Sequence, residues 1–185
     1  KLKMKRKKNI SKIDKVFITG ITGSGGSYLA EYIYLNHKNV EINGIARWHS
    51  TTNNSNIKNI EKNITSHECD LNDFSSILKT LEKIKPDVIF HMASYANVRA
   101  SFLTPSTVMQ NNIIGTSNLL EAIKFLKLDP IIQMCSTSEV YGQVLKREIP
   151  IKETNPIRPA SPYAISKVAQ DFLAQNYFKS YGMKI

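Results

Sequence analysis

Cysteine and long apolar runs are both scarce in this 185-residue chain. Its two cysteines, Cys69 and Cys135, stand far apart, and neither has a second cysteine or a histidine at metal-ligand spacing. This excludes a disulfide-stapled miniprotein, predicts no metal site, and suggests reduced, buried thiols in an intracellular protein. No apolar stretch exceeds about five residues, whereas a membrane-spanning helix needs ~20. The basic start is not followed by the apolar core of a secretory signal, so we expect a cytoplasmic protein without a membrane partner.

Acidic residues are scarce only at the start of the chain. The formal net charge is +10, and residues 1–15 contribute +7 of it through eight basic residues and one acid. The remaining 170 residues carry only +3. We therefore expect a basic, disordered arm over residues 1–14 and a folded domain over residues 15–185. Such an arm could touch nucleic acid or an acidic surface, but we favour a solvated leader or a start-site artefact and expect no nucleic-acid partner.

Strand-like and helix-like segments alternate along the body of the chain. The predicted strands cover residues 15–20, 40–46, 65–69, 87–92 and 130–136. The predicted helices cover residues 27–36, 73–84, 106–127 and 161–181. Polar or proline-containing loops are expected at 47–63 and 140–159, and residues 183–185 resemble the opening of a further strand. Repeated strand–helix units of this length predict an α/β fold with a doubly wound parallel sheet.

A glycine-rich turn follows the first predicted strand. Gly20, Gly23 and Gly26 form a G-x-x-G-x-x-G motif, with Thr22 inside it, at the opening of the first helix. Glycines in such a turn let the backbone approach a pyrophosphate, and the helix N-terminus supplies N–H donors. We therefore expect these four residues to bind a dinucleotide, the alternative being a purely structural glycine turn.

The second predicted strand ends at Arg47, about 20 residues beyond the glycines, with no acid nearby. An acid at this position would bind the free 2′-hydroxyl of NAD, whereas a guanidinium suits a 2′-phosphate. Arg47 therefore favours NADP, the alternative being an exposed arginine on a loop.

Asp70 and Leu71 follow the third predicted strand, where a cofactor would lie across the sheet edge. Asp70 could accept a hydrogen bond from the adenine amino group. It could also cap the next helix, although Asn72 is the better candidate for that cap.

Ala93 and Ser94 follow the fourth predicted strand and are small enough to let a cofactor pass. We include both in the predicted cofactor site. His91, just before them, is expected to be a satisfied core histidine and not a catalyst.

A further group of polar residues predicts acid–base chemistry. Thr137 follows the fifth predicted strand, and Tyr163 and Lys167 are four residues apart, on one face of the last helix. A nearby ammonium and a positively charged nicotinamide would lower the pKa of the Tyr163 phenol towards neutrality. Tyr163 could then act as a general base towards a sugar hydroxyl, with Thr137 bonded to the same oxygen. We also expect Tyr163 and Lys167 to contact the cofactor, Lys167 through the nicotinamide ribose.

These motifs together resemble the extended short-chain dehydrogenase/reductases of the nucleotide-sugar branch. Residues 47–50, 136–142 and 158–167 are most similar to the GDP-mannose 4,6-dehydratases, and the resemblance runs from residue 16 to residue 185. Two features depart from that pattern: Ser24-Gly25 stands where the dehydratases typically carry Gln-Asp, and the segment around Ser161 is equally similar to GDP-4-keto-6-deoxymannose reductases.

The resemblance implies an NADP-dependent, redox-neutral lyase reaction on a nucleotide sugar, with a GDP-hexose favoured. Tyr163, assisted by Thr137 and Lys167, takes the proton of the hexose 4-hydroxyl while hydride leaves C4. Glu139 then removes the C5 proton while water leaves from C6, and hydride returns to C6. Glu139 could alternatively be a surface glutamate at a strand end.

The resemblance also implies a homo-oligomer and a substrate-gripping C-terminal lobe beyond a sixth strand, which this chain would lack. Two alternatives to the dehydratase stay open. One is an NADPH-dependent 4-keto reductase or an NAD(P)-dependent epimerase on the same site. The other is a cofactor-binding remnant without catalysis.

Overall fold

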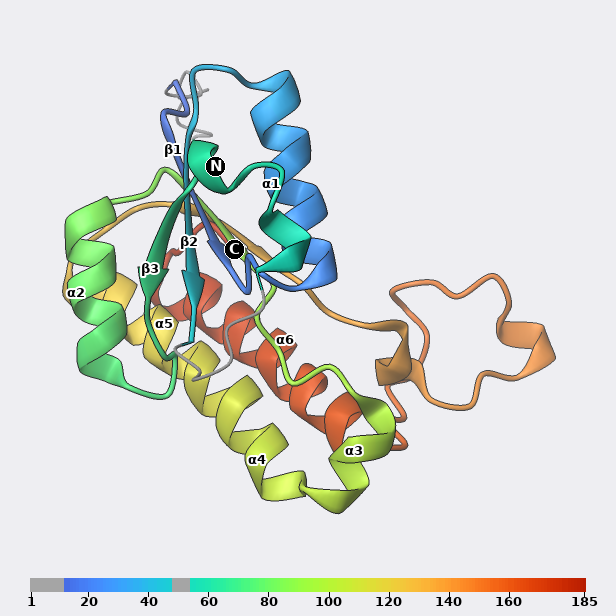
Figure 1. Cartoon of the computed structure of the whole chain (residues 1–185). Helices are drawn as coiled ribbons and strands as arrows, with labels where there is room; N and C mark the ends of the chain where they lie inside the picture. Colours follow the sequence, from blue (N-terminus) through green and yellow to red (C-terminus); the bar gives the residue numbers. More distant parts are fainter. Residues whose placement is uncertain (1–11, 48–53) are drawn as a thin grey trace.

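The computed structural model describes residues 12–47 and 54–185 of the chain. Its centre is a wholly parallel five-stranded sheet in the order β3-β2-β1-β4-β5 (Figure 1). The strands are β1 (Lys15–Thr19), β2 (Glu41–Ala46), β3 (Thr65–Glu68), β4 (Val88–His91) and β5 (Ile131–Met134). All five predicted strands are present with ends within two residues of the prediction, and the predicted doubly wound α/β fold is confirmed.

Helices connect the strands and cover the sheet. The α-helices are α1 (Ser24–Asn36), α2 (Phe74–Ile84), α3 (Val98–Leu103), α4 (Pro105–Met109), α5 (Gly115–Phe125) and α6 (Pro162–Tyr181). Single 3-10 turns occur at η1 (Ser55–Ile57), η2 (Glu61–Asn63), η4 (Ser138–Tyr141) and η5 (Lys146–Glu148). Among these described helices, none is long and apolar enough to cross a membrane.

Two apolar layers hold the helices to the sheet because neighbouring strand residues point to opposite faces. In β1, Phe17 belongs to the layer under α2, α5 and α6, while Ile18 belongs to the layer under α1 and the η1 and η2 turns. Both side chains are fully buried. The sheet is therefore sandwiched between helices, and the carboxyl ends of its strands form one common edge.

The predicted helix over residues 106–127 is wrong in one respect: it is interrupted. A π-helical turn, η3 (Gln110–Ile114), joins α4 to α5. One extra residue in a turn barely changes the spacing of apolar residues, so the pattern reads as a single helix. The short helix α3, which precedes α4, was not predicted. The two helices are separate because Pro105 begins α4.

Two helix starts also differ from the prediction. Helix α1 begins at Ser24, three residues before the expected start, because Gly25 and Gly26 already belong to the helix, with Gly23 as its extended N-cap. The cap of α2 is Asp73, not the expected Asn72, and its carboxylate accepts from the amides of Ser75 and Ser76. Gly182 ends α6 in the left-handed conformation, which favours glycine.

The expected further strand is present as an isolated parallel bridge. Lys184 pairs with Ile131 of β5, and its carbonyl accepts a hydrogen bond of 2.7 Å from the amide of Ile132. Residues 183–185 thus run beside β5 at the edge of the sheet, as the opening of a sixth strand would.

One cysteine departs from the prediction. Cys69 is buried, but Cys135 is exposed because it lies just beyond β5, at the carboxyl edge of the sheet. Both are free thiols.

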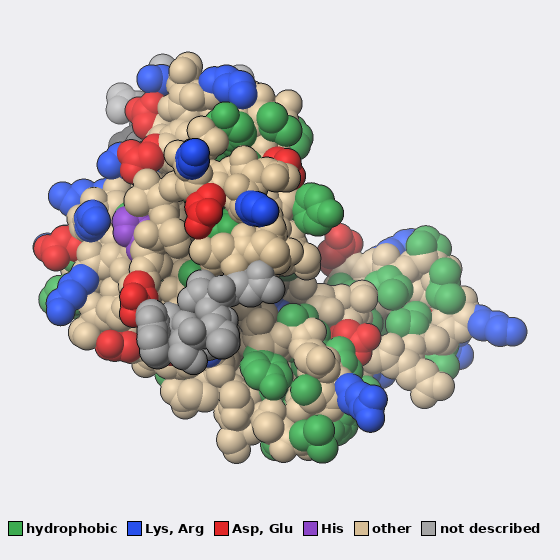
Figure 2. All heavy atoms as spheres, viewed as in Figure 1, with side chains coloured by type: hydrophobic (Ala, Val, Ile, Leu, Met, Phe, Trp, Pro, Cys, Tyr) green, Lys and Arg blue, Asp and Glu red, His purple; other side chains and the backbone are tan. Residues whose placement is uncertain are grey.

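The segment after β5 is irregular, as predicted for residues 140–159, and projects away from the sheet (orange in Figure 1). On the face seen in Figure 2, basic and acidic side chains are interspersed over the described body. The predicted basic arm falls mainly on residues 1–11, which lie outside the described residues, as do residues 48–50 of one resemblance motif.

Candidate active site

The glycine turn brings β1 close to the end of β4. Gly20 has a φ of +73°, which favours glycine, and a Cβ there would lie 2.9 Å from the Cα of Ala93. Gly26 is packed even more tightly, since its Cβ would lie 2.2 Å from the carbonyl oxygen of Gly20. Gly23 closes the turn by donating its amide to the same oxygen at 3.0 Å. Side chains are thus excluded where the first helix meets the strand.

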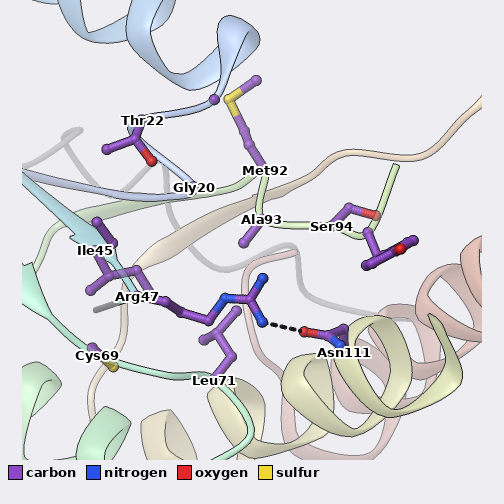
Figure 3. A pocket seen from close by; sticks show the side chains of 13 residues that line it. Gly20, Thr22, Ile45, Arg47, Cys69, Leu71, Met92, Ala93, Ser94 and Asn111 are labelled. Carbon is purple, nitrogen blue, oxygen red and sulfur yellow. Dashed lines mark hydrogen bonds between the residues drawn. The ribbon is translucent and has the colours of Figure 1, made fainter. Parts of the chain in front are cut away.

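A cavity of about 290 Å³ opens beside this turn, at the carboxyl edge of β1, β2, β3 and β4 (Figure 3). Seven residues predicted to bind the cofactor line it: Gly20, Thr22, Gly23, Arg47, Leu71, Ala93 and Ser94. Six more were not predicted: Ile45, Ala46, Cys69, Met92, Tyr95 and Asn111. The cavity therefore lies where a doubly wound sheet binds its ligand.

Arg47 extends from the end of β2 across the cavity (Figure 3). Its Nη1 donates a hydrogen bond of 3.1 Å to Oδ1 of Asn111, which also accepts from Asn72 at 3.3 Å. Arg47 is exposed, so its guanidinium is accessible to an anion. Sequence reasoning missed Asn111 because it appeared to lie within a regular helix, whereas the π-helical turn carries it to the cavity.

Two predicted cofactor residues have other roles in the protein. Gly26 does not line the cavity but allows α1 to approach the turn. Asp70 does not line it either, because its Oδ1 accepts from the amide of Asn72 at 2.9 Å in a local turn. The adjacent Leu71 contributes to the cavity wall instead.

The N-terminal part of α6 carries Tyr163 and Lys167. Ser161 caps this helix by accepting from the amide of Ala164 at 3.0 Å, and Pro162 occupies its first turn. The Tyr163 and Lys167 side chains are on one face, with the Lys167 ammonium 6.0 Å from the centre of the Tyr163 ring. Both residues are buried against the end of the sheet.

Lys167 is held by the backbone beyond β5. Its Nζ donates a hydrogen bond of 2.9 Å to the carbonyl oxygen of Cys135. Burial lowers the pKa of this ammonium below its usual value, so the carbonyl compensates part of the lost hydration. Thr137 and Glu139 follow within four residues of that carbonyl, so the same contact brings them near α6.

The pKa of Tyr163 is raised above its usual value, mainly by burial. A hydrogen bond with the Thr137 side chain lowers this pKa, whereas the Glu139 carboxylate raises it by opposing a second negative charge. The expected lowering of the Tyr163 pKa, which needs a positively charged nicotinamide as well as Lys167, stays a prediction, because in the protein alone burial is the largest effect. These same effects indicate that the structure brings Thr137 and Glu139 close to the Tyr163 phenol.

His91 is buried, and both of its ring nitrogens have hydrogen-bond partners: Thr19 at 2.9 Å and Thr116 at 2.8 Å. The prediction of a satisfied core histidine is confirmed.

Comparison with known proteins identifies relatives over nearly the whole chain. The family model described as GDP-mannose 4,6 dehydratase matches residues 17–185. GDP-mannose 4,6-dehydratase of Vibrio cholerae is 39% identical over 175 residues, which are 90% of this chain and 46% of that protein. The human enzyme of the same name is 35% identical over 176 residues, again 90% of this chain and 46% of that protein. The chain thus spans about half the length of the curated relatives it matches.

Solved structures share the fold. A UDP-glucose 4-epimerase from Thermus thermophilus, solved with NAD, is 29% identical with a TM-score of 0.80, covering 91% of this chain and 52% of that one. A dTDP-glucose 4,6-dehydratase from Streptomyces venezuelae, also solved with NAD, is 25% identical with a TM-score of 0.82, covering 91% and 53%. Both are nucleotide-sugar enzymes of the extended short-chain dehydrogenase/reductase type. With the family model matching from the first strand to the last residue, the chain belongs to the GDP-mannose 4,6-dehydratase family.

Proposed function

We propose that the protein is an NADP-dependent nucleotide-sugar 4,6-dehydratase that converts GDP-mannose to GDP-4-keto-6-deoxymannose. The observation that carries this proposal is the hydrogen bond of 2.9 Å from Lys167 to the carbonyl oxygen of Cys135, which joins the helix of Tyr163 to the segment that carries the Thr137 hydroxyl and the Glu139 carboxylate. A dehydratase needs one base for a hydroxyl proton and a second for a carbon acid, and this group of residues offers both. The family membership supports the same reaction.

The cavity residues fit a dinucleotide. The tight packing around Gly20 and Gly26 leaves no room for a side chain at these two positions, so the backbone of the turn can approach a pyrophosphate. Ser94 Oγ is buried at the cavity with no hydrogen-bond partner among the described residues, so a hydroxyl of a bound ligand could satisfy it. We assign Gly20, Thr22, Gly23, Leu71, Ala93 and Ser94 to this cofactor site, with Tyr163 and Lys167 at its catalytic end.

We infer NADP as the cofactor from Arg47. Its exposed guanidinium follows β2 at the cavity, and among the described residues no carboxylate lines the cavity to bind a free ribose 2′-hydroxyl. The related solved structures named above contain NAD, so the choice between the two cofactors depends on this residue. The chemistry that a bound NADP supplies is reversible hydride transfer.

Within this proposal the chain's own residues handle the protons. Tyr163 accepts the proton of the hexose 4-hydroxyl, and Thr137 holds the same oxygen. Because the pKa of Tyr163 is raised in the protein alone, added positive charge is needed to form its phenolate. Lys167 supplies one charge at 6.0 Å from the ring, and an oxidised nicotinamide would supply another. Glu139, which is exposed, then takes the C5 proton as water leaves C6.

The alternative is an epimerase or a 4-keto reductase on the same four residues. The observation in its favour is that UDP-glucose 4-epimerases share this fold at a TM-score of 0.80. Neither reaction needs a base for C5 and loss of water from C6, so Glu139 separates them from the dehydratase. The domain over residues 15–185, a cytoplasmic location and a homo-oligomer stay predictions.

Incubating the purified chain with GDP-mannose and a catalytic amount of NADP⁺ tests the proposal. We expect a 4-keto-6-deoxy sugar without net change in NADPH. No keto product from GDP-mannose, together with stoichiometric oxidation of NADPH by a keto sugar, would instead support the reductase. Binding of NADP⁺ without either reaction would support the cofactor-binding remnant.

A further inference from the structure

Three side chains form a buried polar chain between the sheet and α5. His91 is the last residue of β4, Thr19 the last of β1, and Thr116 lies in the first turn of α5. His91 Nδ1 is 2.9 Å from Thr19 Oγ1, and His91 Nε2 is 2.8 Å from Thr116 Oγ1. All three residues are buried. The imidazole therefore bridges two layers of the protein.

The hydrogen bonds of Thr19 determine the direction of this chain. Its Oγ1 accepts from the amide of Met92 at 3.1 Å and from the amide of Ala93 at 3.0 Å. A hydroxyl has two acceptor sites and one proton, so the proton of Thr19 is left for His91 Nδ1. The proton of a neutral His91 must then be on Nε2, where it is donated to Thr116.

The bonds of Thr116 agree with this assignment, whereas the contact of 3.5 Å between Gln170 Nε2 and His91 Nε2 would join two donors and is therefore not a hydrogen bond. Thr116 Oγ1 donates to the carbonyl oxygen of Asn112 at 2.6 Å, so both of its acceptor sites are free for other donors. One receives His91 Nε2–H, and the other receives the side-chain amide of Gln170. Gln170 lies in α6, three residues after Lys167. The chain thus continues into the helix that carries the proposed catalytic lysine.

This arrangement holds only with a neutral imidazole. A second proton on Nδ1 of His91 would face the Thr19 hydroxyl, whose acceptor sites are already occupied. Burial, together with the positive charge of Lys167, lowers the pKa of His91 to about 3. The hydrogen-bond geometry and the electrostatics therefore both favour a neutral imidazole at His91.

We propose that His91 is a positioning residue, which sets the place of the Met92–Ala93 backbone at the cofactor cavity relative to the catalytic helix α6. Ala93 lines the cavity and is in contact with the glycine turn, where a Cβ on Gly20 would lie only 2.9 Å from its Cα. A shift of Ala93 would therefore change the cavity directly. This inference rests on the proposed function, because α6 is called catalytic on that basis.

Substitutions at Thr19 test the proposal with little change in volume. Thr19→Val removes the hydroxyl that holds both amides and His91, whereas Thr19→Ser keeps it. We expect the NADP⁺ dissociation constant to rise about tenfold in Thr19→Val and to stay within about twofold in Thr19→Ser, since small displacements in a site have large effects. Ile89→Ala, a buried change on the same strand, controls for stability and should leave the dissociation constant unchanged.

Two measurements report on the chain without any turnover. Amide hydrogen exchange at Met92 and Ala93 should accelerate in Thr19→Val and in His91→Phe, but not in Ile89→Ala. A ¹⁵N-resolved NMR spectrum of the imidazole should show His91 protonated on Nε2 alone between pH 8 and pH 5. A proton on Nδ1, titration near pH 6.5, or equal cofactor affinities for Thr19→Val and Thr19→Ser would overturn the proposal. If these results hold but GDP-mannose is not dehydrated, the proposed function fails and the positioning role stands.

Discussion

The ammonium of Lys167 donates a hydrogen bond of 2.9 Å to the carbonyl oxygen of Cys135, which joins α6 to the chain just beyond β5. One ion thereby fixes two sets of residues: Tyr163 on the helix, and Thr137 and Glu139 after the strand. Because Lys167 is buried, the carbonyl oxygen of Cys135 also replaces part of the hydration that its ammonium loses.

Replacing Tyr163 should separate chemistry from binding. Tyr163→Phe removes only the phenol oxygen, so we expect turnover to be lost while the NADP⁺ dissociation constant changes by no more than a few-fold. Lys167→Ala should impair both, because it also frees the Cys135 carbonyl. Steady-state kinetics and calorimetric titration measure the two effects. Tyr181→Phe, an exposed change on the same helix, is the control, and a Tyr163→Phe enzyme with normal turnover would remove the phenol from the mechanism.

Arg47 should select NADP over NAD. We expect Arg47→Ala to weaken NADP⁺ binding about tenfold to a hundredfold, the range for losing a charge-assisted hydrogen bond, and to leave NAD⁺ binding nearly unchanged. Asn111→Ala is the companion variant, since it removes the side chain that orients the guanidinium and should cause a smaller loss for NADP⁺ only. Equal losses for both cofactors in a calorimetric titration would show that Arg47 supports the loop and not the 2′-phosphate.

The close packing of the glycine turn predicts that a single methyl group added there destabilises the protein. A Cβ at Gly26 would lie 2.2 Å from the carbonyl oxygen of Gly20, so Gly26→Ala should lower the free energy of unfolding by about 2–3 kcal/mol and abolish cofactor binding. Gly182→Ala is the matched control: its φ of +68° costs about 1 kcal/mol, but its Cβ meets no atom within 4 Å. Urea unfolding and NADP⁺ titration compare them, and intact cofactor binding in Gly26→Ala would contradict the role of the turn.

Much of the fold follows from local sequence. Strands β1, β2, β4 and β5 contain short apolar stretches, whereas β3 is polar, and the G-x-x-G-x-x-G turn between β1 and α1 is one residue wider than the dinucleotide fingerprint. The π-helical turn at 110–114 could not be predicted, because apolar periodicity is insensitive to one added residue. Cys135 was misplaced for a related reason: an apolar run does not reveal that its last residue has passed the end of the sheet.

The site was predicted less completely than the fold. Residues at the strand ends were found because their position follows from topology, as for Arg47 and Ala93. Asn111 was missed because it reaches the cavity through the helix irregularity. The raised pKa of Tyr163 in the protein alone was not predicted, because the extent to which burial desolvates the phenol depends on the three-dimensional packing.

Acid should destabilise the protein through His91. The pKa of His91 is lowered from 6.5 to about 3 in the folded state, so below pH 6.5 the unfolded chain binds a proton that the folded protein excludes. The free energy of unfolding should therefore fall by up to about 1.4 kcal/mol per pH unit as the pH drops from 6.5 towards 5. Urea unfolding across this range measures the slope. His91→Phe should flatten it, and His67→Asn should flatten it less, since His67 is only partly buried and its pKa is also lowered. An unchanged slope in His91→Phe would contradict the assignment.

The most direct test of the dehydratase is a single turnover with Glu139→Gln. If Glu139 removes the C5 proton, the variant still oxidises C4 but cannot eliminate water, so reduced cofactor should accumulate after mixing with GDP-mannose. Absorbance near 340 nm, roughly the band of reduced nicotinamide, reports it. We predict a persistent rise in Glu139→Gln and only a transient one in the unmodified protein. Wild-type turnover in Glu139→Gln, with no accumulation, would contradict the account and favour an epimerase or a reductase.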